Sequence, residues 1–124
     1  LPNKITVDAD VLIWYLRGDQ AVAERVEYYL AHDVQLAASV IVVLEVLRGM
    51  RPNEITPTRA LLGSIEHINV DEAVIEEAYA IYRTHRLRGK TLPFADSIIA
   101  ATALHVEAPL LTNNTKDYPQ HVLV

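Results

Sequence analysis

Short apolar segments alternate with helical stretches along this chain, and the alternation limits the folds that it can adopt. Segments rich in β-branched residues predict strands at 4–8, 34–38, 67–70 and 109–112, with a possible edge strand at 121–124. Amphipathic or apolar stretches predict helices at 11–17, 20–31, 40–48, 57–65, 72–88 and 94–106. Because parallel strands need crossover connections of helical length, we predict an α/β fold with a mostly parallel, buried sheet of four to five strands.

Polar residues mark where several of these helices begin. A short polar side chain just before a helix can accept a hydrogen bond from a free backbone N–H of the first turn. The predicted N-caps of this kind are Asp10, Ser39, Thr56 and Asp71. In this interpretation Asp8, which ends the first strand, does not cap a helix and is therefore the better candidate for a functional acid.

The composition narrows the classes of function. With 124 residues, the chain is expected to form one domain over residues 1–124. It contains no cysteine, which excludes disulfide frameworks, thiol catalysis and thiolate zinc sites and suits a cytoplasmic location. No apolar stretch reaches the roughly 18 residues that span a bilayer, so we expect no membrane partner. The formal net charge of −5 argues against a general nucleic-acid coat but allows a local basic patch.

Three acids stand in apolar surroundings, namely Asp8, Glu45 and Asp96. A lone buried carboxylate is costly unless it is paired or binds a metal. Each acid also has a separate structural explanation: Asp8 could bond a neighbouring turn, Asp96 could interact with a helix dipole, and Glu45 could pair with Arg48. One cause would explain all three, because carboxylates that meet at the carboxyl ends of the strands form an oxygen-ligand site for Mg²⁺ or Mn²⁺.

The segment after the last buried strand adds further oxygen atoms at the same edge, from Thr112, Asn114 and Asp117. By itself this stretch is a generic polar loop, but its position directly after a buried strand makes its residues candidates for the same site. No other chemistry competes, because the sequence lacks paired zinc-binding histidines, a glycine-rich phosphate loop and a nucleophile elbow.

Taken together, these residues resemble a known family in the expected order and spacing. The four blocks are Asp8-Ala9-Asp10-Val11-Leu12-Ile13, Ser39-Val40 through Glu45-Val46-Leu47-Arg48-Gly49, Phe94 through Ala103, and Leu111-Thr112-Asn113-Asn114. They resemble the PIN domain, and within it the VapC-type toxins of toxin–antitoxin pairs. The resemblance implies a three-layer α/β/α fold and an Mg²⁺- or Mn²⁺-dependent ribonuclease that hydrolyses RNA phosphodiesters with metal-activated water at a carboxylate cluster.

The resemblance also implies roles for particular residues. Asp8 and Asp96 fall on direct metal ligands of the family, and Glu45 completes the negative site. The usual fourth acid is replaced by Asn114, so either Asp117 takes its place or the second of two metal ions binds weakly. Thr112 and Asn114 are supporting residues.

The resemblance further implies an RNA substrate, a small antitoxin protein and a homodimer. Arg17 and Arg48 are candidates for contact with the RNA or the antitoxin, although basic residues near a helix C-terminus are also expected from the helix dipole. Two other functions stay open. One is a degenerate PIN scaffold without catalysis, and the other is a haloacid-dehalogenase-like phosphatase that would use Asp8 and Asp10.

Overall fold

The fold is built on one parallel sheet, which the computed structural model describes together with the rest of residues 1–124. The strands lie in the order β3-β2-β1-β4, and every neighbouring pair is parallel. Their bounds are β1 Lys4–Val7, β2 Gln35–Ser39, β3 Glu66–Ile68 and β4 Leu110–Leu111. The predicted α/β class is therefore confirmed, with four strands.

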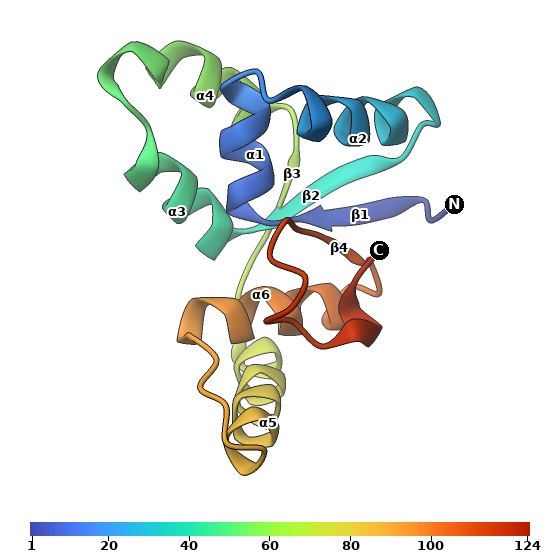
Figure 1. Cartoon of the computed structure of the whole chain (residues 1–124), viewed down its shortest axis with the longest axis vertical. Coiled ribbons are helices and arrows are strands. Elements are labelled where there is room, and N and C mark those ends of the chain that lie inside the picture. The colour runs from blue at the N-terminus through green and yellow to red at the C-terminus, as the bar shows by residue number, and fades with distance from the viewer.

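Helices supply the crossovers between the parallel strands. They are α1 Ala9–Leu16, α2 Gln20–Ala31, α3 Val40–Gly49, α4 Ile55–Gly63, α5 Glu72–Leu87 and α6 Phe94–His105. In Figure 1, α1 and α2 lie on one side of the sheet, and α5 and α6 lie on the other. Within these layers α1 packs against α2 and α3, and α5 packs along α6. The helices thus sandwich the sheet, as a three-layer fold requires.

The helix starts follow capping chemistry, with two corrections. Ser39 and Asp71 cap α3 and α5 as predicted. However, the cap of α1 is Asp8 and not Asp10, because the helix begins directly after the strand. Thr56 is not a cap either, since a 3-10 turn at Pro52–Glu54 leads straight into α4.

The possible edge strand at 121–124 is also corrected. Residues Gln120–Val122 form a 3-10 turn, and only a single parallel bridge joins Leu123 to Leu110 of β4. Because the 3-10 turn extends to Val122, only Leu123 and Val124 are left to lie beside β4, where the N–H of Val124 donates to the carbonyl of Leu110 at 3.0 Å. The chain end nevertheless returns to the edge of the sheet.

The core lies on both faces of the sheet. Ile5 and Val7 of β1 are almost fully buried, and so are Ile99, Ala100 and Ala101 of α6. This explains the nearly all-apolar sequence of α6, which is covered on several sides. No helix is long and apolar enough to cross a membrane.

Candidate functional site

Asp8 lies where β1 ends and α1 begins, at the carboxyl edge of the sheet. It is only 7 % exposed. Its Oδ1 accepts a hydrogen bond from the backbone N–H of Ala9 at 2.8 Å. Its Oδ2 accepts hydrogen bonds from the hydroxyls of Thr112 at 2.8 Å and Tyr118 at 3.0 Å. These donors satisfy a carboxylate that would otherwise be buried at a high cost.

Three further acids share this edge, and we call the four the acid cluster: Asp8, Asp10, Glu45 and Asp96. Asp10 and Asp96 lie in the first turns of α1 and α6, and Glu45 lies on α3. Burial raises the pKa of Glu45 and of Asp96, and the negative charge of Asp8 raises both further. Asp96 also raises the pKa of Glu45. The carboxylates from three helices therefore lie within electrostatic reach of one another.

Asp10 belongs to this cluster, although the sequence predicts it as a helix cap and gives it a catalytic role only in the phosphatase alternative. Its Oδ1 accepts a hydrogen bond from the N–H of Val11 at 2.7 Å, and its Oδ2 accepts one from the N–H of Asn113 at 3.2 Å. Burial raises the pKa of Asp10 to about 6, and the charge of Asp8 contributes to the rise. Asp10 thus links α1 to the segment that follows β4.

Tyr118 is the residue that sequence reasoning misses. It is only 3 % exposed, and its hydroxyl donates to Asp8. Burial and the charges of Asp8 and Asp96 raise the pKa of this phenol, because ionisation would add a charge to the cluster. The one available signal is that Tyr118 is the sole aromatic residue in the polar loop 113–119.

The three oxygen-bearing residues after β4 lie at different distances from the centre. Thr112 is buried, and besides donating to Asp8 it accepts a hydrogen bond from the N–H of Asn114 at 3.0 Å. Asn114 is half-buried, and Asp117 is exposed. The charge of Asp117 raises the pKa of Asp96, as the weakest of its causes. Thr112 is thus the one of the three that directly contacts an acid of the cluster.

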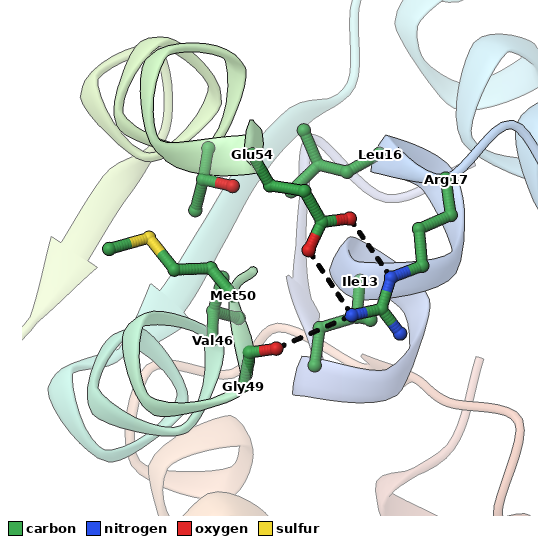
Figure 2. Close-up of a pocket in the computed structure, with 8 residues that line it drawn as sticks. Ile13, Leu16, Arg17, Val46, Gly49, Met50 and Glu54 are labelled. Carbon is green, nitrogen blue, oxygen red and sulfur yellow. Dashed lines mark hydrogen bonds and ion pairs between the residues drawn. The ribbon is translucent and has the colours of Figure 1, made fainter. Parts of the chain in front are cut away.

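The two candidate arginines differ in their surroundings. Arg17 forms an ion pair with Glu54, in which Nε lies 3.0 Å from Oε2, and its Nη2 donates to the carbonyl of Gly49. Figure 2 shows this contact in a small pocket lined by the end of α1, the end of α3 and the turn that carries Glu54. Arg48 is exposed on α3, where its charge lowers the pKa of Glu45 without forming an ion pair. Of the two, only Arg48 lies free beside the cluster.

The acid cluster has no basic partner in direct contact. The ion pairs of the chain are Lys4 with Glu66 and Arg17 with Glu54, and neither includes a cluster acid. The atoms of the acid cluster that could bind a metal are carboxylate oxygens, which hard divalent cations prefer as ligands. The carboxylate oxygens, whose charge Arg25 and Arg48 offset only without direct contact, therefore fit such a cation. The ligands are not preassembled, since no three His, Asp or Glu side chains gather closely enough to form a ready-made metal site.

The chain is similar to known sequences over nearly its whole length. Residues 5–120 match the PIN domain. The chain is 35 % identical to Ribonuclease VapC10 of Mycobacterium tuberculosis (strain H37Rv), over 93 % of this chain and 86 % of that protein. It is 29 % identical to Ribonuclease VapC19 of the same organism, over 91 % and 90 % of the two chains.

Solved structures show the same fold. A toxin–antitoxin complex from Klebsiella pneumoniae contains a chain that is 28 % identical, with a TM-score of 0.79 over 91 % of this chain and 88 % of that one. VapBC2 from Rickettsia felis, bound to a DNA fragment from its promoter, is 18 % identical, with a TM-score of 0.83 over 98 % and 97 %. The family match favours the nuclease over the phosphatase alternative. The chain therefore belongs to the PIN domain family and, within it, to the VapC group.

Proposed function

We propose that this chain is a divalent-metal-dependent ribonuclease and the toxin of a toxin–antitoxin pair, hydrolysing RNA phosphodiester bonds at the acid cluster. One observation carries the proposal: four acids converge at the carboxyl edge of a parallel sheet, and no basic side chain forms an ion pair with any of them. Ligands of open α/β sheets bind at this edge. The VapC relatives, which are named ribonucleases, support the same activity.

The residues take distinct roles in this proposal. Asp8 and Asp96 would hold Mg²⁺ or Mn²⁺, and Glu45 would complete the negative site. A bound cation of this kind neutralises phosphate charge and makes a water molecule more acidic. Thr112 keeps Asp8 in place through its hydrogen bond. Arg48, exposed on the same helix as Glu45, is the candidate for holding an RNA phosphate.

Asn114 and Asp117 bear on the number of metal ions. Asn114 supplies a neutral oxygen where the family has its fourth acid, and Asp117 is exposed. A neutral amide binds a hard cation more weakly than a carboxylate does. We therefore propose one full metal site and one weaker site, with Asp117 contributing the remaining negative charge near Asp96.

Protein partners form the second part of the proposal. The solved neighbours include toxin–antitoxin complexes, so we propose that a small antitoxin inhibits this chain in the cytoplasm. A basic antitoxin segment would complement the acid cluster electrostatically. We also propose a homodimer, since Ile75 and Tyr79 are exposed one turn apart on α5. Sedimentation equilibrium of the isolated chain would give a mass of twice 13.9 kDa.

Cleavage of a labelled structured RNA tests the proposed activity. The wild-type chain should cleave with Mg²⁺ or Mn²⁺ and should lose activity in EDTA. Asp96→Asn should lower the rate by at least about 100-fold, because changes beside a metal ligand already cost about 10- to 100-fold. The matched control is Glu77→Gln on α5, an exposed acid outside the cluster, which should cleave like the wild type. Cleavage that persists both in EDTA and in Asp96→Asn would refute the mechanism.

A scaffold without catalysis is the second candidate. It is favoured by Asn114 at the position of the family's fourth acid and by the absence of a preassembled ligand group. A scaffold would bind its protein partner but neither Mn²⁺ nor a cleavable RNA. Equilibrium dialysis of the folded chain against Mn²⁺ separates the two, because saturable binding that Asp96→Asn abolishes supports the nuclease alone.

A further inference from the structure

Tyr118 is tied closely to Asp8, although it comes from a polar loop. Its side chain is buried, and its hydroxyl lies 3.0 Å from Asp8 Oδ2. The same hydroxyl also lies near enough to Asp96 for hydrogen bonding to lower the pKa of that acid. An ionised carboxylate only accepts hydrogen bonds, so the phenol must be the donor. This contact joins residues that are 110 positions apart in the sequence.

The segment after β4 holds this hydroxyl in place from both ends. At its start, the N–H of Asn113 donates to Asp10 Oδ2 at 3.2 Å. At its end, the N–H of Val124 donates to the carbonyl of Leu110 at 3.0 Å. Between these anchors the ring of Tyr118 packs into the hydrophobic core together with Val122. A packed ring on an anchored loop has little freedom to withdraw its hydroxyl.

The hydrogen bonds at Asp8 are distributed unequally over its two oxygens. A carboxylate offers about four lone-pair positions, about two on each oxygen. Oδ2 accepts from both Thr112 and Tyr118, so both of its positions are filled. Oδ1 accepts only from the N–H of Ala9, so one position stays free. Thr112 is itself fixed, because the N–H of Asn114 donates to its hydroxyl oxygen.

We propose that Tyr118 is a positioning residue that, together with Thr112, occupies Oδ2 of Asp8 and leaves only Oδ1 to bind a divalent cation. This inference rests on the proposed metal-dependent function, and it adds to it the way in which Asp8 meets the metal. Asp8 then acts as a ligand through a single oxygen and cannot chelate with both.

A single-oxygen ligand affects which cations the site accepts. Mg²⁺ demands near-ideal octahedral geometry, whereas Ca²⁺ takes six to eight oxygens and readily accepts bidentate carboxylates. Mn²⁺ shares the octahedral oxygen preference of Mg²⁺. By keeping Oδ2 occupied, Tyr118 and Thr112 disfavour the larger coordination shell of Ca²⁺. The tyrosine hydroxyl thus contributes to metal selectivity without contacting the metal.

The experiment is Mn²⁺ binding in competition with Ca²⁺, followed by the electron paramagnetic resonance signal of free Mn²⁺. Tyr118→Phe removes only the hydroxyl and leaves the ring to fill its place. The ratio of the Ca²⁺ Kd to the Mn²⁺ Kd should fall by about tenfold, within the range for changes beside a metal ligand. For RNA cleavage kcat should fall and KM should stay unchanged, because the Tyr118 side chain is only 3 % exposed and offers almost no surface for RNA to contact.

Two further variants make the result decisive. Tyr29→Phe removes a hydroxyl from a half-buried tyrosine of α2 and should leave the Kd ratio unchanged. Thr112→Val removes the other donor to Oδ2 and should lower the ratio as Tyr118→Phe does. Because Thr112 donates to Asp8 and not to Asp96, this variant also separates an effect at Asp8 from one at Asp96, and it decides the matter if Tyr118→Phe does not fold. An unchanged ratio in the folded variants overturns the inference while the proposed function stands. If the wild-type chain itself binds no Mn²⁺, the proposed function and this inference fail together.

Discussion

The two ends of α1 differ in whether their acids have a basic partner. At its start, Asp8 and Asp10 join Glu45 and Asp96 in the acid cluster, where burial and mutual repulsion raise the pKa values of Asp10, Glu45 and Asp96. At its end, Arg17 pairs with Glu54, and its hydrogen bonds lower the pKa of that acid to about 2. Both regions contain carboxylates, and they differ in whether a basic side chain is in direct contact with them.

This difference separates a structural contact from a candidate site. The Arg17–Glu54 pair connects α1, the end of α3 and the turn before α4, and it needs nothing from outside. The acid cluster keeps a net repulsion that no basic side chain of the chain relieves by direct contact. Perturbed groups of this second kind gather at functional sites, where a bound ligand supplies the missing charge. The contrast can be tested by adding or removing charge at each end.

The largest effect is expected from adding the missing cation. At a free Mn²⁺ concentration of about 100 times Kd, the free energy of unfolding should rise by about 2.7 kcal/mol, since the metal binds only the folded chain. Urea denaturation with Mn²⁺ and with EDTA measures this difference. Asp96→Asn should abolish it, and Glu77→Gln should keep it. A wild-type chain whose unfolding ignores Mn²⁺ contradicts the view of the cluster as a cation site.

A somewhat smaller effect is expected from removing a donor inside the cluster. Thr112→Val should lower the free energy of unfolding by about 1–3 kcal/mol, because its buried hydroxyl serves both Asp8 and the N–H of Asn114. Thermal and urea unfolding in EDTA measure the loss. Thr112→Ser keeps a hydroxyl and is the matched control. If valine proves harmless, the hydrogen bonds at Asp8 contribute less than their burial indicates.

The next effect concerns the pH dependence of the metal-free protein. Asp10 has a folded pKa of about 6 and an ordinary value of 3.8, so the folded chain binds this proton more tightly than the unfolded chain does. The contribution of Asp10 to stability is therefore fully present below its ordinary pKa and is lost as the pH rises through the folded value. Because Asp10 is only half-buried, solvent screening reduces its share to about 1 kcal/mol.

Urea denaturation in EDTA at a series of pH values would reveal this loss. Asp10→Asn should flatten the decline between about pH 4 and about pH 6, and the slope is the readout because the variant also loses an acceptor. Glu77→Gln should decline like the wild type. Stability that rises over this interval in the wild-type chain would show that the repulsion at the cluster has been overestimated.

The parallel sheet and three acids of the cluster could be predicted from the sequence, because the patterns that indicate them lie in short stretches of the chain. Alternating strands and helices predicted the parallel sheet, and Asp8, Glu45 and Asp96 stood out because each interrupts an apolar run. The structure brings these three acids to one edge, while their roles in catalysis stay predictions. Their convergence needed no long-range information beyond the rule that parallel strands end at a common edge.

The remaining features of the site could not be predicted, because they depend on contacts between distant segments or on where a helix begins. Tyr118 reaches Asp8 only because the loop after β4 folds back over the cluster, and the sequence of that loop reads simply as polar. Asp10 was predicted as a cap because the exact start of α1 decides whether Asp8 or Asp10 fills that position. The Arg17–Glu54 pair joins residues that are 37 positions apart, one of them in a 3-10 turn. No periodic pattern in the sequence predicts such a contact.

The smallest effect is expected at the end of α1 where Arg17 pairs with Glu54. Glu54→Gln should destabilise the chain at neutral pH, because the Arg17 guanidinium loses its ionised partner. The folded pKa of Glu54, about 2, lies below its ordinary value of 4.5, so its contribution is present above the ordinary value and is lost as the pH falls through the folded one. Urea denaturation should therefore show a wild-type advantage that fades between these two pH values and shrinks with added salt. RNA cleavage and Mn²⁺ binding should stay unchanged, because Arg17 lies at the opposite end of α1 from Asp8 and neither Arg17 nor Glu54 shifts the pKa of a cluster acid. A difference that persists in acid would mean that Glu54 acts through packing, and a loss of Mn²⁺ binding would mean that the two ends of α1 are coupled.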